Sequence, residues 1–132
     1  MKLIIYADGV SRGNPGPPAI GATIRDEHGR LIAGISRRID WTTNNQAEYQ
    51  AIIATLEEAV NLGASQVDIS MDSELVVRQL KGEYRVKRAT LKLLYQRVKE
   101  LESQLKSFAI RHIPRELNQE ADELANVAFD GN

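Results

Sequence analysis

The chain has 132 residues, of which 42% are hydrophobic, and its 17 Lys and Arg against 18 Asp and Glu give a formal net charge of −1. This length fits one domain with its own core, and the balanced charge predicts no general attraction to polyanions or membranes, so any nucleic-acid site must be local. The chain has no cysteine, which excludes disulfides and thiolate chemistry and leaves zinc only two histidines beside carboxylates.

The amino-terminal segment carries the first predicted strand. Residues 2–7, KLIIYA, are mostly apolar, and the Gly- and Pro-rich segment after them cannot continue regular structure. We therefore expect a buried strand that ends at Asp8, followed by a loop. The apolar run is too short for a signal peptide, and no stretch of about 18 apolar residues occurs. We expect a soluble, cytoplasmic protein.

The next segments predict a hairpin and a long helix. Two strand-like runs flank DEHGR, a turn centred on Gly29, so the first three strands are expected to be antiparallel. From residue 47 to residue 62 the apolar positions keep helical spacing. Thr43 and Gln46 form a capping box before this helix, and Gly63 ends it.

The second half of the chain alternates strands and helices. QVDISMD alternates apolar and polar residues and predicts a fourth strand ending at Asp72. A short helix over residues 73–80, an amphipathic helix over 88–105, a fifth strand over 107–113 and a final helix over 117–128 follow. This order predicts one α/β domain, residues 1–132, with a five-stranded mixed sheet and helices packed on it.

Four carboxylates occupy positions that a shared site would use. Asp8 and Asp72 follow the first and fourth strands, and they lie side by side if those strands are neighbours. Glu48, in the first turns of its helix, can lean toward the sheet edge. Asp122 shares a face of the last helix with Asn118, one turn earlier.

The chemistry of such a cluster is that of a divalent cation. Clustered carboxylates repel one another unless cations lie between them, and Asp and Glu without His or Cys suit Mg²⁺ or Mn²⁺. Two such ions about 3.5–4 Å apart activate a water and stabilise the leaving oxygen at a phosphodiester. Taken singly, each acid has the simpler interpretation of solvation or a favourable helix dipole, so the hypothesis depends on their combination.

Four segments, YADGVSRGNPGPPAIG, TTNNQAEY, MDSELVV and HIPRELNQEADELA, together resemble the type 1 ribonuclease H family over essentially the whole chain. The resemblance implies a ribonuclease H-like fold, a five-stranded mixed sheet whose first three strands are antiparallel. It also implies an endonuclease that hydrolyses the RNA strand of RNA/DNA hybrids with two Mg²⁺ ions, leaving 5′-phosphate and 3′-hydroxyl ends. We expect Mn²⁺ to substitute, and a monomer that binds the hybrid and no membrane.

Carried over by motif, the catalytic and metal-binding residues are expected to be Asp8, Glu48, Asp72 and Asp122. His112 corresponds to the family's mobile histidine, which assists proton movement or product release. A histidine beside a proline in a loop is otherwise simply solvated.

The resemblance also implies substrate contacts. Asn44 and Asn45 offer more hydrogen-bonding capacity than a helix cap needs, and in the family they face the minor groove, where amides can meet 2′-hydroxyls. A cap formed by Asn44 or Thr43 is compatible with this role. The remaining candidates are Gly13 and Asn14 near the nucleic-acid backbone, Thr43 at a DNA phosphate, Gln46 at a base or sugar edge, and Trp41, either stacked on the substrate or packed.

The sequence departs from many relatives in two ways. A long insertion rich in Lys, Arg and Trp is reduced here to LKGEYRVKRATL, and we expect no hybrid-binding domain before residue 1. We therefore expect a compact form with weaker or differently distributed hybrid binding and no processivity. The alternatives are another nuclease of the same superfold that acts on DNA, and a hybrid-binding module without catalysis.

Overall fold

A five-stranded mixed sheet forms the centre of the molecule. The computed structural model describes residues 1–13 and 16–130, with strands in the order β3-β2-β1-β4-β5. The strands are β1 (Lys2–Ser11), β2 (Pro18–Asp26), β3 (Leu31–Arg38), β4 (Gln66–Met71) and β5 (Ser107–His112). The first three pair antiparallel, whereas β4 pairs parallel with both β1 and β5. The predicted mixed sheet is confirmed, and the condition for bringing Asp8 and Asp72 together is met, because the first and fourth strands are neighbours.

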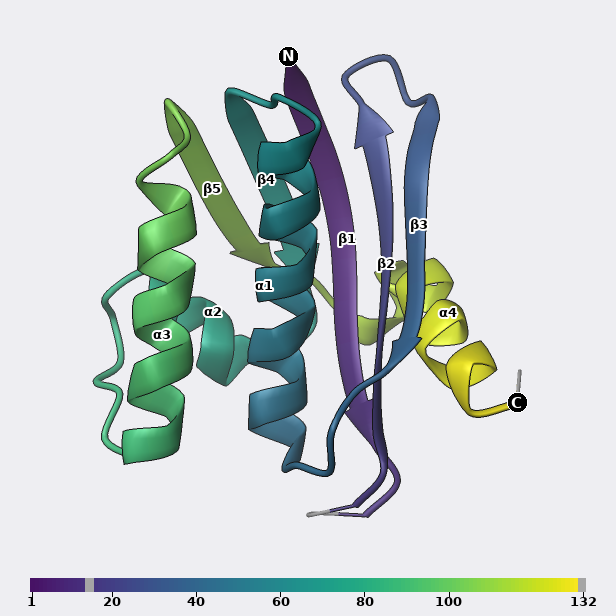
Figure 1. Cartoon of the computed structure of the whole chain (residues 1–132), viewed down its shortest axis with the longest axis vertical. Helices are drawn as coiled ribbons and strands as arrows, with labels where there is room; N and C mark the ends of the chain where they lie inside the picture. The colour runs from purple at the N-terminus through teal and green to yellow at the C-terminus, as the bar shows by residue number, and fades with distance from the viewer. Residues whose placement is uncertain (14–15, 131–132) are drawn as a thin grey trace.

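Helices cover both faces of this sheet. They are α1 (Asn44–Asn61), α2 (Glu74–Leu80), α3 (Ala89–Glu102) and α4 (Gln119–Asp130), with a short 3₁₀ turn at Arg115–Leu117. In Figure 1, α1 and α3 lie side by side in front of the sheet, and α4 crosses behind β1, β2 and β3, with which it is in contact. Among the described residues, no helix combines the length and apolar character needed to cross a bilayer.

The first strand is longer than predicted, and this changes the position of Asp8. The prediction that the strand ends at Asp8 is wrong, because β1 continues to Ser11 in antiparallel pairing with β2. Its parallel pairing with β4 ends earlier, at Tyr6 opposite Ser70. Asp8 and Asp72 therefore each lie two residues beyond the last β1–β4 pair, at the same level of the sheet.

Two helix boundaries also differ from prediction. The final helix begins at Gln119 instead of residue 117, because Arg115–Leu117 forms a separate 3₁₀ turn. Leu117, the first residue of the predicted helix, is 64% exposed. The third helix ends at Glu102, so Leu105 lies outside it and packs on the core from the following turn.

Close packing of β1 against the start of α1 depends on Gly9. A Cβ atom at this position would overlap the backbone carbonyl of Ala47 and lie 2.6 Å from the backbone nitrogen of Glu48. The predicted capping box of Thr43 and Gln46 is confirmed and fixes where the helix starts. Gly9 therefore allows the strand that carries Asp8 to touch the helix turn that carries Glu48.

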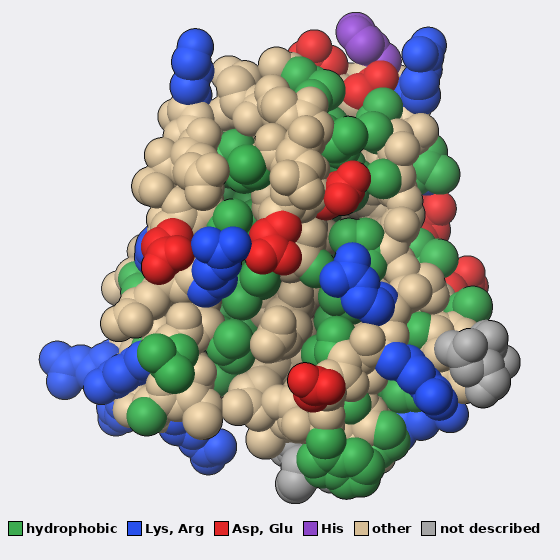
Figure 2. Space-filling model, in the orientation of Figure 1, with side chains coloured by type: hydrophobic (Ala, Val, Ile, Leu, Met, Phe, Trp, Pro, Cys, Tyr) green, Lys and Arg blue, Asp and Glu red, His purple; other side chains and the backbone are tan. Residues whose placement is uncertain are grey.

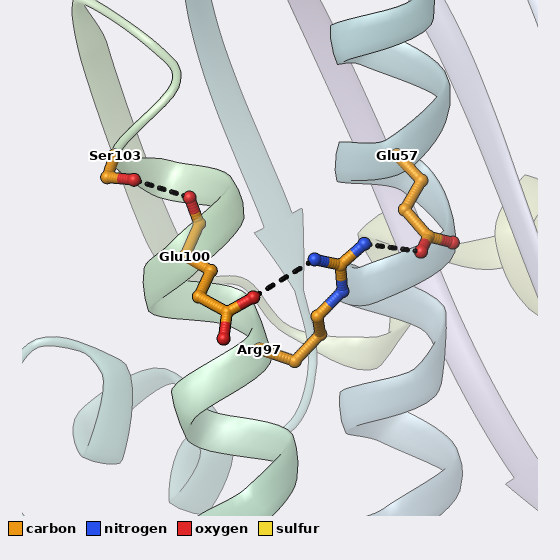
Figure 3. Close-up of polar contacts among 4 residues, drawn as sticks. All are labelled: Glu57, Arg97, Glu100 and Ser103. Carbon is orange, nitrogen blue, oxygen red and sulfur yellow. Dashed lines mark hydrogen bonds and ion pairs between the residues drawn. The ribbon is translucent and has the colours of Figure 1, made fainter.

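Charged side chains cross the groove between α1 and α3. Figure 2 shows acidic and basic side chains next to one another between these helices, and a group of Lys and Arg at the lower left, over the start of α3. In Figure 3 the guanidinium of Arg97 donates to Glu57 of α1 at 3.0 Å and to Glu100 of its own helix at 3.1 Å. All three side chains are more than 40% exposed, so these ion pairs contribute little to stability.

We expect Arg97→Ala to change the melting temperature by less than about 2 °C, because exposed ion pairs are screened by water and salt. Thermal unfolding followed by circular dichroism at low and high NaCl measures this. The small difference should shrink further as salt is added. A large, salt-independent loss would contradict the assignment of this network to the solvated surface.

Candidate active site

The four predicted carboxylates line one open cleft of about 620 Å³. The cleft lies beyond the point where β1 and β4 separate, between the first turns of α1 and α2 and the start of α4. Asp8 comes from β1, Glu48 from α1, Asp72 from the end of β4 and Asp122 from α4. Side chains that are far apart in the sequence are thus brought to one place.

Asp8 is the most buried of the four acids, with 5% of its surface exposed. Burial, the charge of Asp72, a hydrogen bond with Asp122 and the charges of Asp122 and Glu48 together raise the pKa of Asp8 to about 9. Without a cation in the cleft, this carboxyl is therefore protonated at neutral pH. The same four groups that the sequence singled out act on one another electrostatically.

Glu48 is held by a residue that sequence reasoning missed. Burial, followed by the charge of Asp72, raises the pKa of Glu48 to about 7, and a hydrogen bond from the Ser73 hydroxyl opposes this rise. Ser73 is also the N-cap of α2, where its side chain accepts from the backbone N–H of Val76 at 3.4 Å. Its position directly after Asp72 and before a short helix was the available sequence signal.

Arg115 is a second cleft residue that the sequence did not reveal. Its Nη2 lies 4.0 Å from Oδ1 of Asp122, and the side chain is 79% exposed. It lines the acidic cleft together with the four carboxylates. An exposed cation here can approach an anionic group of a ligand, but the segment HIPREL gave no periodic signal that would have placed it.

The donors of the cleft suit hard divalent cations. Among the residues that the structure describes, no group of three or more His, Cys, Asp or Glu side chains is arranged to hold a metal ion. Mg²⁺, however, is usually bound by one or two carboxylates and completes its octahedron with waters and substrate phosphate oxygens. Repelling carboxylates with raised pKa values and no sulfur donor fit ions of this kind.

Two of the predicted substrate contacts lie in the cleft and two lie beside it. Asn44 and Asn45 line it from the first turn of α1. Thr43 and Gln46 are used in the cap: Gln46 Oε1 accepts from the Thr43 backbone N–H at 3.0 Å, and the Thr43 hydroxyl accepts from the Gln46 N–H at 3.3 Å. Neither side chain is part of the cleft wall.

Gly13, Trp41 and His112 do not line the cleft. Gly13 adopts a φ of 112°, which glycine tolerates, and Asn14 falls outside the described residues. Trp41 is 68% exposed, so of its two interpretations the packed one is wrong. His112 ends β5 opposite Met71 and is exposed, without lining the cleft.

Comparisons with known proteins agree with this architecture. Residues 6–128 match the family described as reverse transcriptase-like. A bifunctional protein of Mycobacterium tuberculosis is 44% identical over 131 residues, which are 98% of this chain and 36% of that protein. Ribonuclease HI of Halobacterium salinarum is 42% identical over 129 residues, 98% of this chain and 65% of that protein. The chain therefore spans only part of the length of these relatives.

Solved structures are similar over the whole chain. The crystal structure of RNase H1 from Halobacterium salinarum has a TM-score of 0.97 at 39% identity and covers 100% of both chains. LC11-RNase H1, isolated from compost, has been crystallised with an RNA/DNA hybrid, and it has a TM-score of 0.92 at 44% identity over 98% of this chain and 97% of that one. The matches in sequence and in fold lead to one conclusion: the chain belongs to the type 1 ribonuclease H family.

Proposed function

We propose that this chain is an endoribonuclease that hydrolyses the RNA strand of RNA/DNA hybrids by a two-metal-ion mechanism, leaving 5′-phosphate and 3′-hydroxyl ends. The observation that carries the proposal is the meeting of Asp8, Glu48, Asp72 and Asp122 in one cleft. The proposal is supported by the similarity to ribonucleases H, one of which has been crystallised with an RNA/DNA hybrid.

The chain's own residues would prepare the site for two Mg²⁺ or Mn²⁺ ions held by the four carboxylates. When bound, the ions supply a water activated at neutral pH and charge stabilisation for the leaving oxygen. The Ser73 hydroxyl fixes one oxygen of Glu48 by donating a hydrogen bond. Arg115, which lies beside Asp122 in the cleft wall, would offer a positive charge to a phosphate of the bound strand. His112, exposed at the end of β5, is proposed to assist proton movement or product release.

Recognition of the RNA strand is assigned to the first turn of α1. The minor groove of an A-like duplex is wide and displays 2′-hydroxyls, which both donate and accept hydrogen bonds. The amides of Asn44 and Asn45 both donate and accept, and they stand in the same cleft as Glu48. Glu48 lies one helical turn after Asn44 and Asn45, so an RNA strand bound by these amides is held next to the metal ligands.

One gel tests the proposed function. End-labelled RNA/DNA hybrid, duplex RNA, duplex DNA and single strands are incubated with Mg²⁺, with Mn²⁺ and with EDTA. We expect cleavage of the hybrid RNA strand alone, only with a divalent ion, and extension of the products by a polymerase that needs a 3′-hydroxyl. Cleavage of duplex DNA would support another nuclease of the superfold, and binding without cleavage would support a non-catalytic module.

Trp41 is proposed as an additional contact with the hybrid. The backbone beside it is fixed by two hydrogen bonds between Gly16 and Thr42, at 3.2 and 3.4 Å, while the ring itself is exposed. An aromatic ring held in this way offers a neutral surface for sugars or bases. This kind of contact is less sensitive to salt than a contact between a cation and a phosphate.

We expect hybrid binding to quench the fluorescence of Trp41. The signal reports on this residue alone, because it is the only tryptophan in the chain. Trp41→Ala should weaken hybrid binding about tenfold, within the range measured for aromatic contacts to nucleic acid. Fluorescence anisotropy of a labelled hybrid measures the affinity, in Asp8→Asn protein to keep the RNA intact. Leu93→Ala is the control, since Leu93 is 70% exposed on α3. Tight binding with unchanged emission would remove Trp41 from the interface.

A further inference from the structure

Asn118 connects the elements that carry three of the four carboxylates. It lies between the 3₁₀ turn and α4 and is only 1% exposed, although its side chain is an amide. Its Nδ2 donates to the backbone carbonyl of Ala7 at 2.9 Å and to Oδ1 of Asp72 at 3.4 Å. Its own backbone carbonyl accepts from the N–H of Asp122 at 3.1 Å. One buried residue thus touches the strand beside Asp8, the carboxylate of Asp72 and the first turn of α4.

The side chain of Asn118 does not cap α4, although the residue directly precedes this helix. An asparagine directly before a helix usually accepts a hydrogen bond from a backbone N–H of the first turn through its side-chain oxygen. Here the side-chain oxygen is buried and has no hydrogen-bond partner among the described residues. The amide is turned to β1 and Asp72 instead, so helix capping does not explain why an amide occupies this position.

The orientation of this amide is determined by its neighbours. If the nitrogen and the oxygen exchanged places, the oxygen would face two acceptors, the Ala7 carbonyl and the Asp72 carboxylate. The shorter bond to Ala7 fixes the amide on β1, and the longer bond then restrains Asp72. Because Asp72 follows the last residue of β4, its backbone is no longer held by the β4 strand pairing.

We propose that Asn118 is a positioning residue that sets the orientation of Asp72 toward a divalent ion and fixes it relative to the strand of Asp8. This role rests on the proposed function, since it assumes that Asp72 binds metal. A neutral amide suits the task better than Lys or Arg, because it restrains one oxygen without cancelling the negative charge that attracts the ion. Residues that orient metal ligands in this way typically change metal affinity or activity 10- to 100-fold, as an order of magnitude, when they are replaced.

The test compares two variants of Asn118 with a matched control. Asn118→Leu keeps the approximate shape and removes the donor, and Asn118→Ala removes both. Thr55→Ala is the control, because Thr55 is also fully buried and donates to a backbone carbonyl, that of Ile52 at 2.8 Å, but lies about two turns beyond Glu48 on α1.

Calorimetric titration of the metal-free proteins with Mn²⁺ is the first measurement, and the kcat and KM for hybrid cleavage are the second. For both Asn118 variants we expect Mn²⁺ affinity and kcat to fall roughly 10- to 100-fold while KM for the hybrid changes less than about twofold. The control should retain wild-type values. Wild-type Mn²⁺ affinity in both Asn118 variants would overturn the proposal, and so would failure of both to fold, since the amide would then serve the fold itself.

A double-mutant cycle in EDTA separates this inference from the proposed function. Urea unfolding of Asn118→Ala, Asp72→Ala and the double variant measures whether the two side chains are energetically coupled, without metal or substrate. Non-additive effects support the contact, and additive effects overturn the positioning role. If the cycle shows coupling but the wild-type protein leaves hybrids uncut, the proposed function is contradicted and the contact between Asn118 and Asp72 still stands.

Discussion

Asp8→Asn is expected to lower the rate of hybrid cleavage at least about 10³-fold, as replacement of a central catalytic group typically does. Asp8 is the acid on which the other three act most strongly, and because it is buried beside them it ionises at neutral pH only when a cation is bound. An amide has nearly the same shape but carries no negative charge, so the cleft should remain folded and lose metal affinity. Single-turnover cleavage with Mg²⁺ and with Mn²⁺ measures the loss. Full activity of this variant would remove Asp8 from the mechanism.

The same substitution should stabilise the metal-free protein. The pKa of Asp8 rises from its ordinary value of 3.8 to about 9 in the folded state, so between these values the folded protein binds more protons than the unfolded chain. The contribution of Asp8 to the stability of the metal-free wild type is therefore fully present below the unfolded pKa and is lost as pH rises through the folded value of about 9. Asn does not titrate, so the variant lacks this loss. Each pKa unit corresponds to about 1.4 kcal/mol, so we expect Asp8→Asn to raise the free energy of unfolding by at least about 1.4 kcal/mol at pH 7.

Urea unfolding at pH 5, 7 and 9 in EDTA tests the sign of this effect, and Asp26 supplies a control with the opposite sign. Backbone hydrogen bonds from Arg30 and His28 lower the pKa of Asp26 in the hairpin turn. Its contribution to stability is present above its unfolded pKa and is lost as pH falls through the lower folded value. Asp26→Asn should therefore destabilise the protein at neutral pH, whereas Asp8→Asn stabilises it. A destabilised Asp8→Asn protein in EDTA would contradict the electrostatic account of the cleft.

The sequence was most informative where structure depends on neighbours along the chain. The alternation of β4, the apolar stripe of α1 and the capping box of Thr43 and Gln46 are local patterns, and each was predicted. The extension of β1 past Asp8 was not, because its last residues are ordered by β2, a partner beyond a Gly- and Pro-rich loop. Leu117 was misassigned for a similar reason, since the 3₁₀ turn interrupts a helical spacing that continues in the sequence.

The same contrast between local patterns and contacts across distant elements applies to the residues of the candidate site. Asp72 follows a strand, and Glu48 and Asp122 stand in the first turns of helices, where general rules of α/β sheets direct attention. Asp8 lies inside β1, just beyond its last pair with β4, and all four acids line one cleft. Their catalytic roles stay predictions. Ser73, Arg115 and Asn118 contact acids carried by other elements. The sequence offers a cap position for Ser73 and places Asn118 one turn before Asp122, but the contacts with Glu48 and Asp72 appear only in the three-dimensional arrangement.

Gly9→Ala is expected to lower both stability and activity, because the backbones of β1 and α1 pack directly against each other at Gly9. The added methyl group would overlap the backbone carbonyl of Ala47, and a backbone clash cannot be relieved by rotating a side chain. The start of α1 must move away and carry Glu48 from Asp8. We expect a loss of about 3 kcal/mol, the upper part of the range for overpacking, measured by urea unfolding.

The activity of the Gly9 variant should fall further than its stability alone explains, because displacement of a reacting group by about 1 Å can cost on the order of 100-fold in rate. Gly34→Ala is the matched control, another strand glycine whose added Cβ would meet nothing closer than 3.9 Å. It should be neutral or stabilising by about 0.5–1 kcal/mol, since alanine restricts the unfolded chain more than glycine does, and its kcat should be that of the wild type. If both variants behaved alike, glycine conformational entropy would be the common cause. A loss confined to Gly9→Ala would instead show that the distance between β1 and α1 sets the geometry of the acidic cleft.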